Sequence, residues 1–309
     1  MAGEIAVRDT PSDSEGSLTC ALSIVIPTHD ERDNIWYLLW ALRNIVAGTP
    51  TEVIIIDDSD DGTAEVARGA IHTLGTPHFH ICCEHRPPGS PRAGGLATAV
   101  DLGLRLACAP YIAVIDGDLQ HPPEGLRRLL DIAITHRADI VMATRFRKGD
   151  RYAGLNSSRP ISRGLKWMTK LLFADHLLRV SDPLGGFFLL RRSLIEDVQL
   201  RPVGHKIALE VLIRCGWASL VEVPYRFRAR RGGRMRQGVL VLWHVLRLLR
   251  EVAAAGRFWK FCMVGASGFL IDLLIFALLL SHHAPLWLAW PAGTEAAILN
   301  NFAGGNLLF

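Results

Sequence analysis

Apolar and polar positions alternate along the first half of the chain in a pattern that predicts a layered α/β fold. Short apolar runs rich in β-forming residues recur at 22–27, 53–57, 79–83, 111–116 and 139–144. Segments with the length and periodicity of helices separate them, at about 31–46, 63–74, 95–107 and 123–136. This alternation is typical of crossover units, so we expect a parallel sheet that is covered by helices on both faces.

Polar residues follow three of the expected strands at the point where each strand ends. They are Pro27-Thr28-His29-Asp30, Asp57-Asp58-Ser59 and Asp116-Gly117-Asp118. Ligands of such sheets bind outside the carboxyl ends of the strands. We therefore expect these acidic residues to meet in one crevice.

The section after Thr144 is expected to complete the same domain and to build a second wall of the crevice. It contains a polar stretch that begins at Arg145, a helix-like segment near 161–178, an apolar run GGFFLL and a helix near 205–215. The stretch RFRARRGGRMR at 226–236 is too rich in charge and glycine to be core.

The last third of the chain carries the signals of a membrane segment. Residues 261–280 contain a single charge, Asp272, and twenty helical residues at 1.5 Å each span a bilayer core of about 30 Å. An acid is costly in hydrocarbon, so Asp272 marks either a functional or a pairing site. A weaker apolar segment at 286–309 is expected to return across the membrane, and because it ends without a polar tail we expect an incomplete membrane domain.

Two features adjoin this segment. Residues 238–256 are apolar at most positions with charges interspersed, which fits an interfacial helix on the bilayer or an ordinary buried helix. Arg257 and Lys260 precede the span and predict that it starts in the cytoplasm.

The first twenty residues are polar and acidic, so we expect no cleaved secretory peptide and a catalytic half that stays in the cytoplasm.

The amino-acid composition agrees with a chain of which one part is not in contact with water. Half of the 309 residues are apolar and 28 more are glycine, which exceeds the usual share in soluble proteins. The six cysteines show no metal-ligand spacing and are expected to be reduced and inert. A chain of this length can stabilise its core without disulfide bonds.

The net charge of +4 is the sum of an acidic N-terminal part and a basic C-terminal part of the chain. Residues 1–120 hold 17 acids and 7 bases, whereas residues 121–309 hold 13 acids and 27 bases. Of the 34 bases, 29 are arginine, which is suited to bidentate phosphate contacts, although genomic base composition explains this excess equally well. The two halves are therefore expected to face different partners.

The strongest chemical signal is the run DGDLQHPPE at 116–124. Two carboxylates one residue apart at a strand end can bind a hard divalent cation, which keeps water and takes nucleotide diphosphate oxygens as its other ligands. The acid-x-acid spacing alone is common in turns. Its position after a buried strand and before Gln-His-Pro-Pro-Glu makes the signal specific.

Further motifs surround this run in a fixed order. They are IPTHDERDNI at 26–35, IIIDDSDDGTAEVA at 54–67, GGLATAV at 94–100, ATRF at 143–146, SRPISRG at 158–164, DPLGGF at 182–187 and EVPYRFRARRGG at 222–233. With these motifs the chain resembles the inverting glycosyltransferases of family 2, and within them the polyprenol (dolichol) phosphate mannose synthases. The segment from Arg257 onwards resembles the opening of a GtrA-like membrane domain.

The resemblance implies a GT-A, Rossmann-like nucleotide-sugar transferase domain followed by a helical transmembrane segment. The expected divisions are a flexible N-terminal segment at 1–21, the transferase domain at 22–236, a juxtamembrane amphipathic helix at 237–256 and a GtrA-like segment of two helices at 257–309.

The resemblance also implies roles for individual residues. The donor would be bound by Pro27, Thr28, Glu31, Asp58, Asp116 and Arg230, and a Mg²⁺ or Mn²⁺ ion by Asp116, Asp118 and Gln120. The acceptor phosphate would be bound by Arg145, Arg159 and Ser162, with Asp118 and Arg145 as the catalytic pair.

Plainer interpretations stay open for some of these positions. The acids at 57–61 also fit a solvated turn and helix cap before Thr63, and any single arginine also fits a solvated face. His121 matches the family pattern, with orientation of its loop as the simplest role.

The implied reaction is the inverting transfer of mannose from GDP-mannose to a polyprenyl monophosphate for cell-surface glycosylation. A phosphate monoester has a second pKa of about 6, so the acceptor is largely ionised near pH 7 and needs no strong base. A cation would neutralise the departing diphosphate, and arginines would clamp the acceptor.

Two alternatives remain for the function. One is transfer of glucose or another sugar from a UDP donor, and the other is a nonenzymatic membrane flippase or scaffold subunit. The expected location is the cell membrane, with several spans and the catalytic domain on the cytoplasmic side. The expected partners are the nucleotide sugar, the polyprenyl phosphate and the bilayer, and no nucleic acid.

Overall fold

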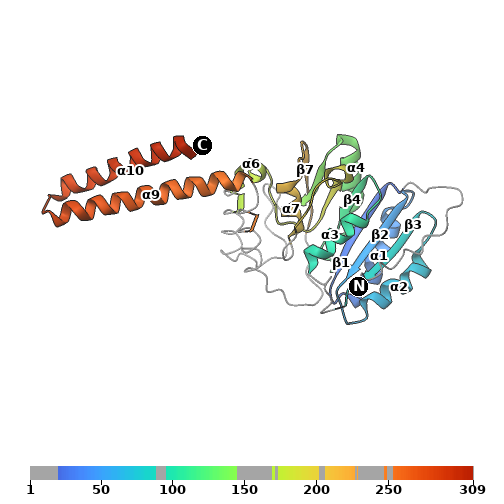
Figure 1. Ribbon diagram of the computed structural model, residues 1–309. Coiled ribbons are helices and arrows are strands. Elements are labelled where there is room, and N and C mark those ends of the chain that lie inside the picture. The colour runs from blue at the N-terminus through green and yellow to red at the C-terminus, as the bar shows by residue number, and fades with distance from the viewer. Residues whose placement is uncertain are drawn as a thin grey trace, which may run out of the picture.

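A computed structural model shows an α/β domain from which a long helical hairpin extends (Figure 1). It describes residues 20–87, 95–144, 169–170, 173–201, 206–226, 228, 247–248 and 253–308. The expected membrane-proximal segment at 237–256 and the basic stretch at 226–236 therefore lie almost wholly outside the described residues. The same holds for the N-terminal segment 1–19.

Seven strands form one sheet. They are β1 (Leu22–Thr28), β2 (Thr51–Asp57), β3 (Phe79–His85), β4 (Tyr111–Val114), β5 (Ile140–Thr144), β6 (Phe188–Arg191) and β7 (Leu220–Pro224), in the order β3-β2-β1-β4-β6-β5-β7. The first four strands are parallel, and all four helices expected between the first five strands are present. These helices are α1 (Arg32–Ile45), α2 (Thr63–Leu74), α3 (Leu96–Leu106) and α4 (Gly125–His136).

The five strands expected in a parallel sheet all run in one direction, and β6 joins them as an antiparallel strand. This strand lies between β4 and β5 and runs antiparallel to both, while β7 runs parallel to β5. It is formed by the apolar run GGFFLL, whose residues Phe188, Leu189 and Leu190 are buried. A strand that is buried on both faces reads as a continuous apolar run, and such a run carries no signal of direction.

The connections near β6 are short. They are α6 (Ala174–Leu177), the 3₁₀ turn η1 (Arg192–Leu194) and α7 (Ile207–Arg214). The helix expected near 205–215 is confirmed as α7. Of the helix expected near 161–178, the described residues include Thr169, Lys170 and the single-turn α6.

Side chains that alternate along the strands separate two apolar layers. On β1, Ile24 and Ile26 pack in the layer of α1, α2 and α4, whereas Val25 packs in the layer of α3 and α7. Gly103 brings α3 close to β1, since a Cβ there would lie 2.3 Å from Cγ1 of Val25. The two layers hold the carboxyl ends of the strands in fixed relative positions.

The hairpin is made of α9 (Ala253–Ser281) and α10 (Leu286–Leu308), which lie side by side (Figure 1). Among the described residues, Phe261–Ser281 is the one helical stretch that is long and apolar enough to cross a membrane, with a mean hydropathy of 2.3. Small residues bring the helices together: a Cβ on Gly293 would lie 2.6 Å from Oδ1 of Asp272. Asp272 therefore faces α10.

All six cysteines are free thiols, as expected. Burial raises the pKa of Cys83 to about 12 and that of Cys215 to about 11. Both thiols are therefore protonated at neutral pH, and the thiolate is the reactive form. Neither cysteine is suited to be a nucleophile.

Candidate active site

A fully buried carboxylate, Asp57, lies at the end of β2, where the crevice is expected. Asp57 accepts hydrogen bonds from the hydroxyls of Thr28 (2.7 Å) and Ser59 (2.6 Å), and Nδ1 of His85 lies 3.0 Å from its other oxygen. A buried carboxylate must be satisfied in this way. Asp57 therefore ties together the segments that follow β1, β2 and β3, and the Thr28 side chain serves this network.

Next to it, Asp58 forms a bidentate ion pair with Arg86. The guanidinium Nε and Nη2 donate to the two carboxylate oxygens, each at 2.7 Å, and the side chains are only 2% (Arg86) and 11% (Asp58) exposed. Arg86 also donates to the hydroxyl of Thr98 (3.2 Å) at the start of α3. Asp58, an expected donor ligand, is thus held in one orientation by a residue that the sequence motifs did not single out.

Asp61 serves the structure of the turn, as the plainer interpretation allows. Its carboxylate accepts hydrogen bonds from the amide and hydroxyl of Thr63 and from the amide of Arg32. Burial raises the pKa of Asp61, but these hydrogen bonds outweigh burial and leave the pKa below its usual value. The stabilisation they give is present above the ordinary aspartate pKa and is lost as the pH falls through the lowered value.

The loop after β4 packs directly onto the loop after β1. A Cβ on Gly117 would lie 3.0 Å from Cγ2 of Thr28 and 3.4 Å from Cγ of Glu31, so the absence of a side chain permits the contact. Glu31 is buried and accepts a hydrogen bond from the amide group of Asn34 (2.7 Å). The structure therefore brings the expected donor-binding loop at 27–31 against Gly117, the residue between Asp116 and Asp118.

Asp116 and Asp118 stand on this loop in defined orientations. Nε2 of His121 lies 3.1 Å from Oδ2 of Asp116, and the amide of Gln120 donates to Oδ1 of Asp118 (3.0 Å). Leu119, between Asp118 and Gln120, has a left-handed backbone with φ 58°. The Asp116 side chain is 28% exposed, so it remains in contact with solvent.

The donor set fits a hard divalent cation. Among the described residues there is no cluster of three or more His, Cys, Asp or Glu side chains that would form an all-protein cage. Two carboxylates with the Gln120 amide supply oxygen ligands and leave room for water and phosphate oxygens, as Mg²⁺ and Mn²⁺ prefer. Asp116, Asp118 and Gln120 are the residues that would hold the ion.

Gly186 forms part of this cradle and supports a prediction. A Cβ there would lie 2.7 Å from Oδ2 of Asp116, a contact that real Cβ atoms do not make. We expect Gly186→Ala to displace the carboxylate and to raise the cation concentration needed for half-maximal activity about tenfold. Gly216→Ala is the matched control, because a Cβ at Gly216 meets nothing within 4 Å. An unchanged cation requirement in Gly186→Ala would show that Asp116 does not bind the ion.

The other residues that were expected to bind the donor or the acceptor phosphate lie outside the described part of the chain. They are Arg145, Arg159, Ser162 and Arg230. Arg228, just before the last of these, is described: its amide donates to the carbonyl of Gln120 (2.9 Å) and its guanidinium lies 3.2 Å from Glu124.

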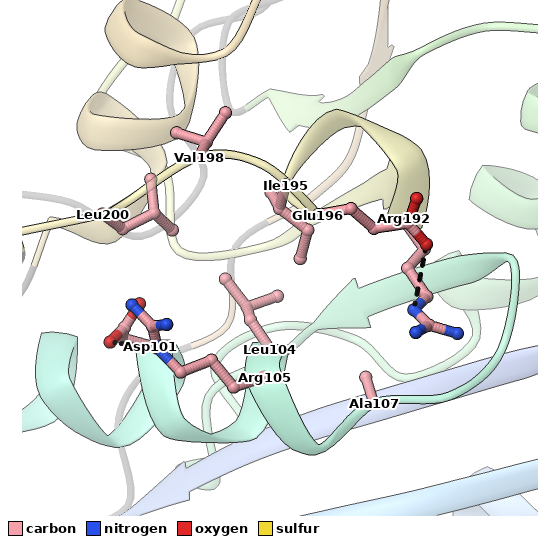
Figure 2. Close-up of a pocket in the computed structure, with 9 residues that line it drawn as sticks. All are labelled: Asp101, Leu104, Arg105, Ala107, Arg192, Ile195, Glu196, Val198 and Leu200. Atoms are coloured by element: carbon pink, nitrogen blue, oxygen red, sulfur yellow. Dashed lines mark hydrogen bonds and ion pairs between the residues drawn. The ribbon is translucent and has the colours of Figure 1, made fainter.

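A separate hollow lies at the opposite ends of the strands. Its volume is about 330 Å³, and Figure 2 shows Leu104, Ile195 and Leu200 lining it between α3 and the segment after η1. Ion pairs of Arg105 with Asp101 and of Arg192 with Glu196 flank it. Because it adjoins Ala107, just before β4, it is not part of the crevice at the carboxyl ends.

Comparison with known proteins identifies the class. Residues 23–199 match glycosyl transferase family 2, and residues 260–308 match the GtrA/DPMS transmembrane domain. The chain belongs to glycosyltransferase family 2, with a C-terminal GtrA/DPMS transmembrane domain.

Curated relatives show which members of this family the chain resembles. The chain is 32% identical over 287 residues to the dolichol-phosphate mannosyltransferase of Pyrococcus furiosus, covering 91% of this chain and 78% of the relative. It is 30% identical to the enzyme of the same name from Saccharomyces cerevisiae, covering 74% and 86%. These relatives support transfer of a sugar to a polyprenol phosphate.

Solved structures confirm the fold. Glucosyl-3-phosphoglycerate synthase from Mycobacterium tuberculosis, in complex with Mn²⁺, UDP-glucose and phosphoglyceric acid, superposes with a TM-score of 0.58 at 21% identity, covering 80% of this chain and 85% of that one. At this identity the similarity concerns the fold alone. The fold is of GT-A type, and the helical hairpin follows it.

Proposed function

We propose that this chain transfers mannose, with inversion, from GDP-mannose to a polyprenyl monophosphate, giving the polyprenyl phosphate mannose used in cell-surface glycosylation. The observation that carries the proposal is the pair Asp116 and Asp118 after β4, whose intervening Gly117 packs against Thr28 and Glu31. The same chain bears a helix long and apolar enough to cross a membrane. The names of the curated relatives support mannose as the sugar.

The metal dependence of the reaction is part of the proposal. Asp116, Asp118 and Gln120 would hold a Mg²⁺ or Mn²⁺ ion, as their oxygen donors and spacing suit it. The mycobacterial neighbour binds Mn²⁺ together with a nucleotide sugar, which supports the choice. When bound, the ion supplies positive charge to the diphosphate that departs from the sugar.

The protein side chains then have to hold two anionic groups, the donor diphosphate and the acceptor phosphate, in the relative orientation that the reaction needs. Pro27, Thr28, Glu31 and Asp58 surround the donor end of the crevice, where the Arg86 pair fixes Asp58. Arg145, Arg159, Ser162 and Arg230 are proposed from the sequence motifs to hold the phosphates, with Arg145 beside the reacting groups. The acceptor is already ionised near neutral pH, so no general base is required of the protein.

We also propose how the chain is placed at the membrane. Residues 22–236 form the transferase domain on the cytoplasmic side, 237–256 lie at the interface and 257–309 form a membrane segment of two helices. Ten bases and one acid occur within 226–260, just before the apolar span. Such a basic segment is attracted to anionic lipid headgroups and to the acceptor phosphate.

The test is a donor comparison on the full chain. Membranes that contain the protein are incubated with polyprenyl phosphate, Mg²⁺ or Mn²⁺, and either labelled GDP-mannose or labelled UDP-glucose. We expect lipid-linked label from GDP-mannose, and none above the level of membranes without the protein from UDP-glucose. Label from a UDP-sugar alone would reject mannose as the sugar. The absence of lipid-linked label from either donor would favour the flippase or scaffold alternative.

A further inference from the structure

Three side chains from distant parts of the sequence form a hydrogen-bonded chain behind the proposed cation site. The hydroxyl of Tyr225, directly after β7, lies 2.8 Å from Nδ1 of His121, and Nε2 of His121 lies 3.1 Å from Oδ2 of Asp116. The chain thus begins 104 residues away from His121 in sequence and ends on a carboxylate of the crevice.

The chemistry of the three groups sets the direction of this chain. An ionised carboxylate only accepts hydrogen bonds, so the proton of a neutral His121 must be on Nε2, where it faces Asp116. Nδ1 then has only a lone pair to offer, so the Tyr225 hydroxyl must be the donor to it. Asp116 therefore selects the tautomer of His121, and the tyrosine hydroxyl stabilises that tautomer and fixes the orientation of the ring by donating to Nδ1.

Packing keeps the rings in place. The His121 side chain is 5% exposed and its ring centroid lies 5.5 Å from those of both Phe187 and Tyr225. Phe187 meets the Tyr225 ring edge-on at 6.0 Å, and the amide of Tyr225 donates to the carbonyl of Thr144 (3.0 Å). The tyrosine is thus anchored by its backbone and its ring, independently of its hydroxyl.

We infer that Tyr225 is a positioning residue for the cation site: its hydroxyl fixes the orientation of the His121 ring, and His121 in turn fixes the plane of the Asp116 carboxylate. The inference rests on the proposed function, because it assumes that Asp116 binds the ion. It extends that proposal by assigning a role to the residue directly after β7, which does not touch the ion or the substrates.

Loss of the hydroxyl has a definite consequence. Without the donor at Nδ1, the His121 ring keeps its bond to Asp116 but loses the second hydrogen bond that fixes its orientation. The Asp116 carboxylate then also loses its fixed plane and leaves the orientation that binds the cation. Outer groups of this kind typically change metal affinity by 10- to 100-fold.

The experiment measures Mn²⁺ affinity of the full chain in detergent, by the electron paramagnetic resonance signal of free Mn²⁺, with GDP present and no sugar donor. Tyr225→Phe keeps the ring and removes only the hydroxyl, so we expect about tenfold weaker Mn²⁺ binding with an unchanged melting temperature. Tyr37→Phe removes the hydroxyl of a tyrosine that is 62% exposed on α1 and should leave both values unchanged.

A double-mutant cycle tests whether the effect passes through His121. His121→Ala should weaken Mn²⁺ binding by more than Tyr225→Phe does. In the His121→Ala background, Tyr225→Phe should add less than a twofold change, because the group that it positions is already absent. Equal effects of Tyr225→Phe in both backgrounds would overturn the inference, as would unaltered affinity in the single variant.

The same measurement separates this inference from the proposed function. If Asp118→Asn retains the Mn²⁺ affinity, the cation site is wrong and both proposals fall. If Asp118→Asn loses Mn²⁺ while Tyr225→Phe does not, only the role of Tyr225 is rejected. If Mn²⁺ binds and responds to Tyr225→Phe but no sugar is transferred, only the proposed reaction is rejected.

Discussion

Asp118→Asn is expected to lower the rate of sugar transfer about a thousandfold at saturating donor while leaving the melting temperature unchanged. The variant removes one of two carboxylates that we propose to hold the cation, and the charge that a cation supplies to a leaving phosphate is worth several kcal/mol. A loss of about 4 kcal/mol corresponds to a factor of about a thousand. The measurement is transfer of label from GDP-mannose to polyprenyl phosphate at a series of Mn²⁺ concentrations.

Asp131→Asn is the matched control for this variant. Asp131 lies on α4, where its side chain is 55% exposed and pairs with Arg127. Its removal should leave the transfer rate within a factor of two. Wild-type activity in Asp118→Asn would refute the assigned role of the carboxylate and would favour the nonenzymatic alternative.

Arg86→Ala is expected to have the largest effect on stability. It removes the partner of Asp58 and leaves a carboxylate that is 11% exposed without its bidentate ion pair. Breaking such a pair by removing one partner typically costs about 3–5 kcal/mol, which for a domain of this size lowers the melting temperature by about 10 °C. Thermal unfolding of the full chain in detergent measures the shift.

Two further variants make the result specific. Arg127→Ala breaks an exposed ion pair with Asp131, whose side chains are 49% and 55% exposed, and should shift the melting temperature by no more than about 3 °C. Adding Asp58→Asn to Arg86→Ala should recover part of the loss, because the unpaired charge is removed. A melting temperature in Arg86→Ala equal to that of Arg127→Ala would mean that the pair does not stabilise the crevice.

The sequence pattern predicted the parallel part of the fold well, because short apolar runs alternate there with segments that have the apolar periodicity of helices. Strands β1 to β5 and helices α1 to α4 all occur within a few residues of their expected positions. The position and direction of β6 were not predictable in the same way. Its apolar run is compatible with either direction, and only pairing with β4 and β5 decides between them.

The candidate site was predictable to the extent that its residues follow strands. The loops after β1, β2 and β4 meet as expected, since carboxyl ends of parallel strands share one edge. Arg86 and Tyr225 were missed as site residues, because each acts on a partner far along the chain. The position of Arg86 three residues after the strand expected at 79–83 is the one signal that was available for it.

The proposed cation site is tested most directly by the position of Mn²⁺ in crystals of the protein soaked with GDP and Mn²⁺, located by anomalous scattering. We expect a peak at about 2.0–2.2 Å from carboxylate oxygens of Asp116 and Asp118, as expected for an ion of this size with oxygen ligands. A bound GDP whose ion lies elsewhere, or that binds without any ion, would show that these residues do not hold the cation.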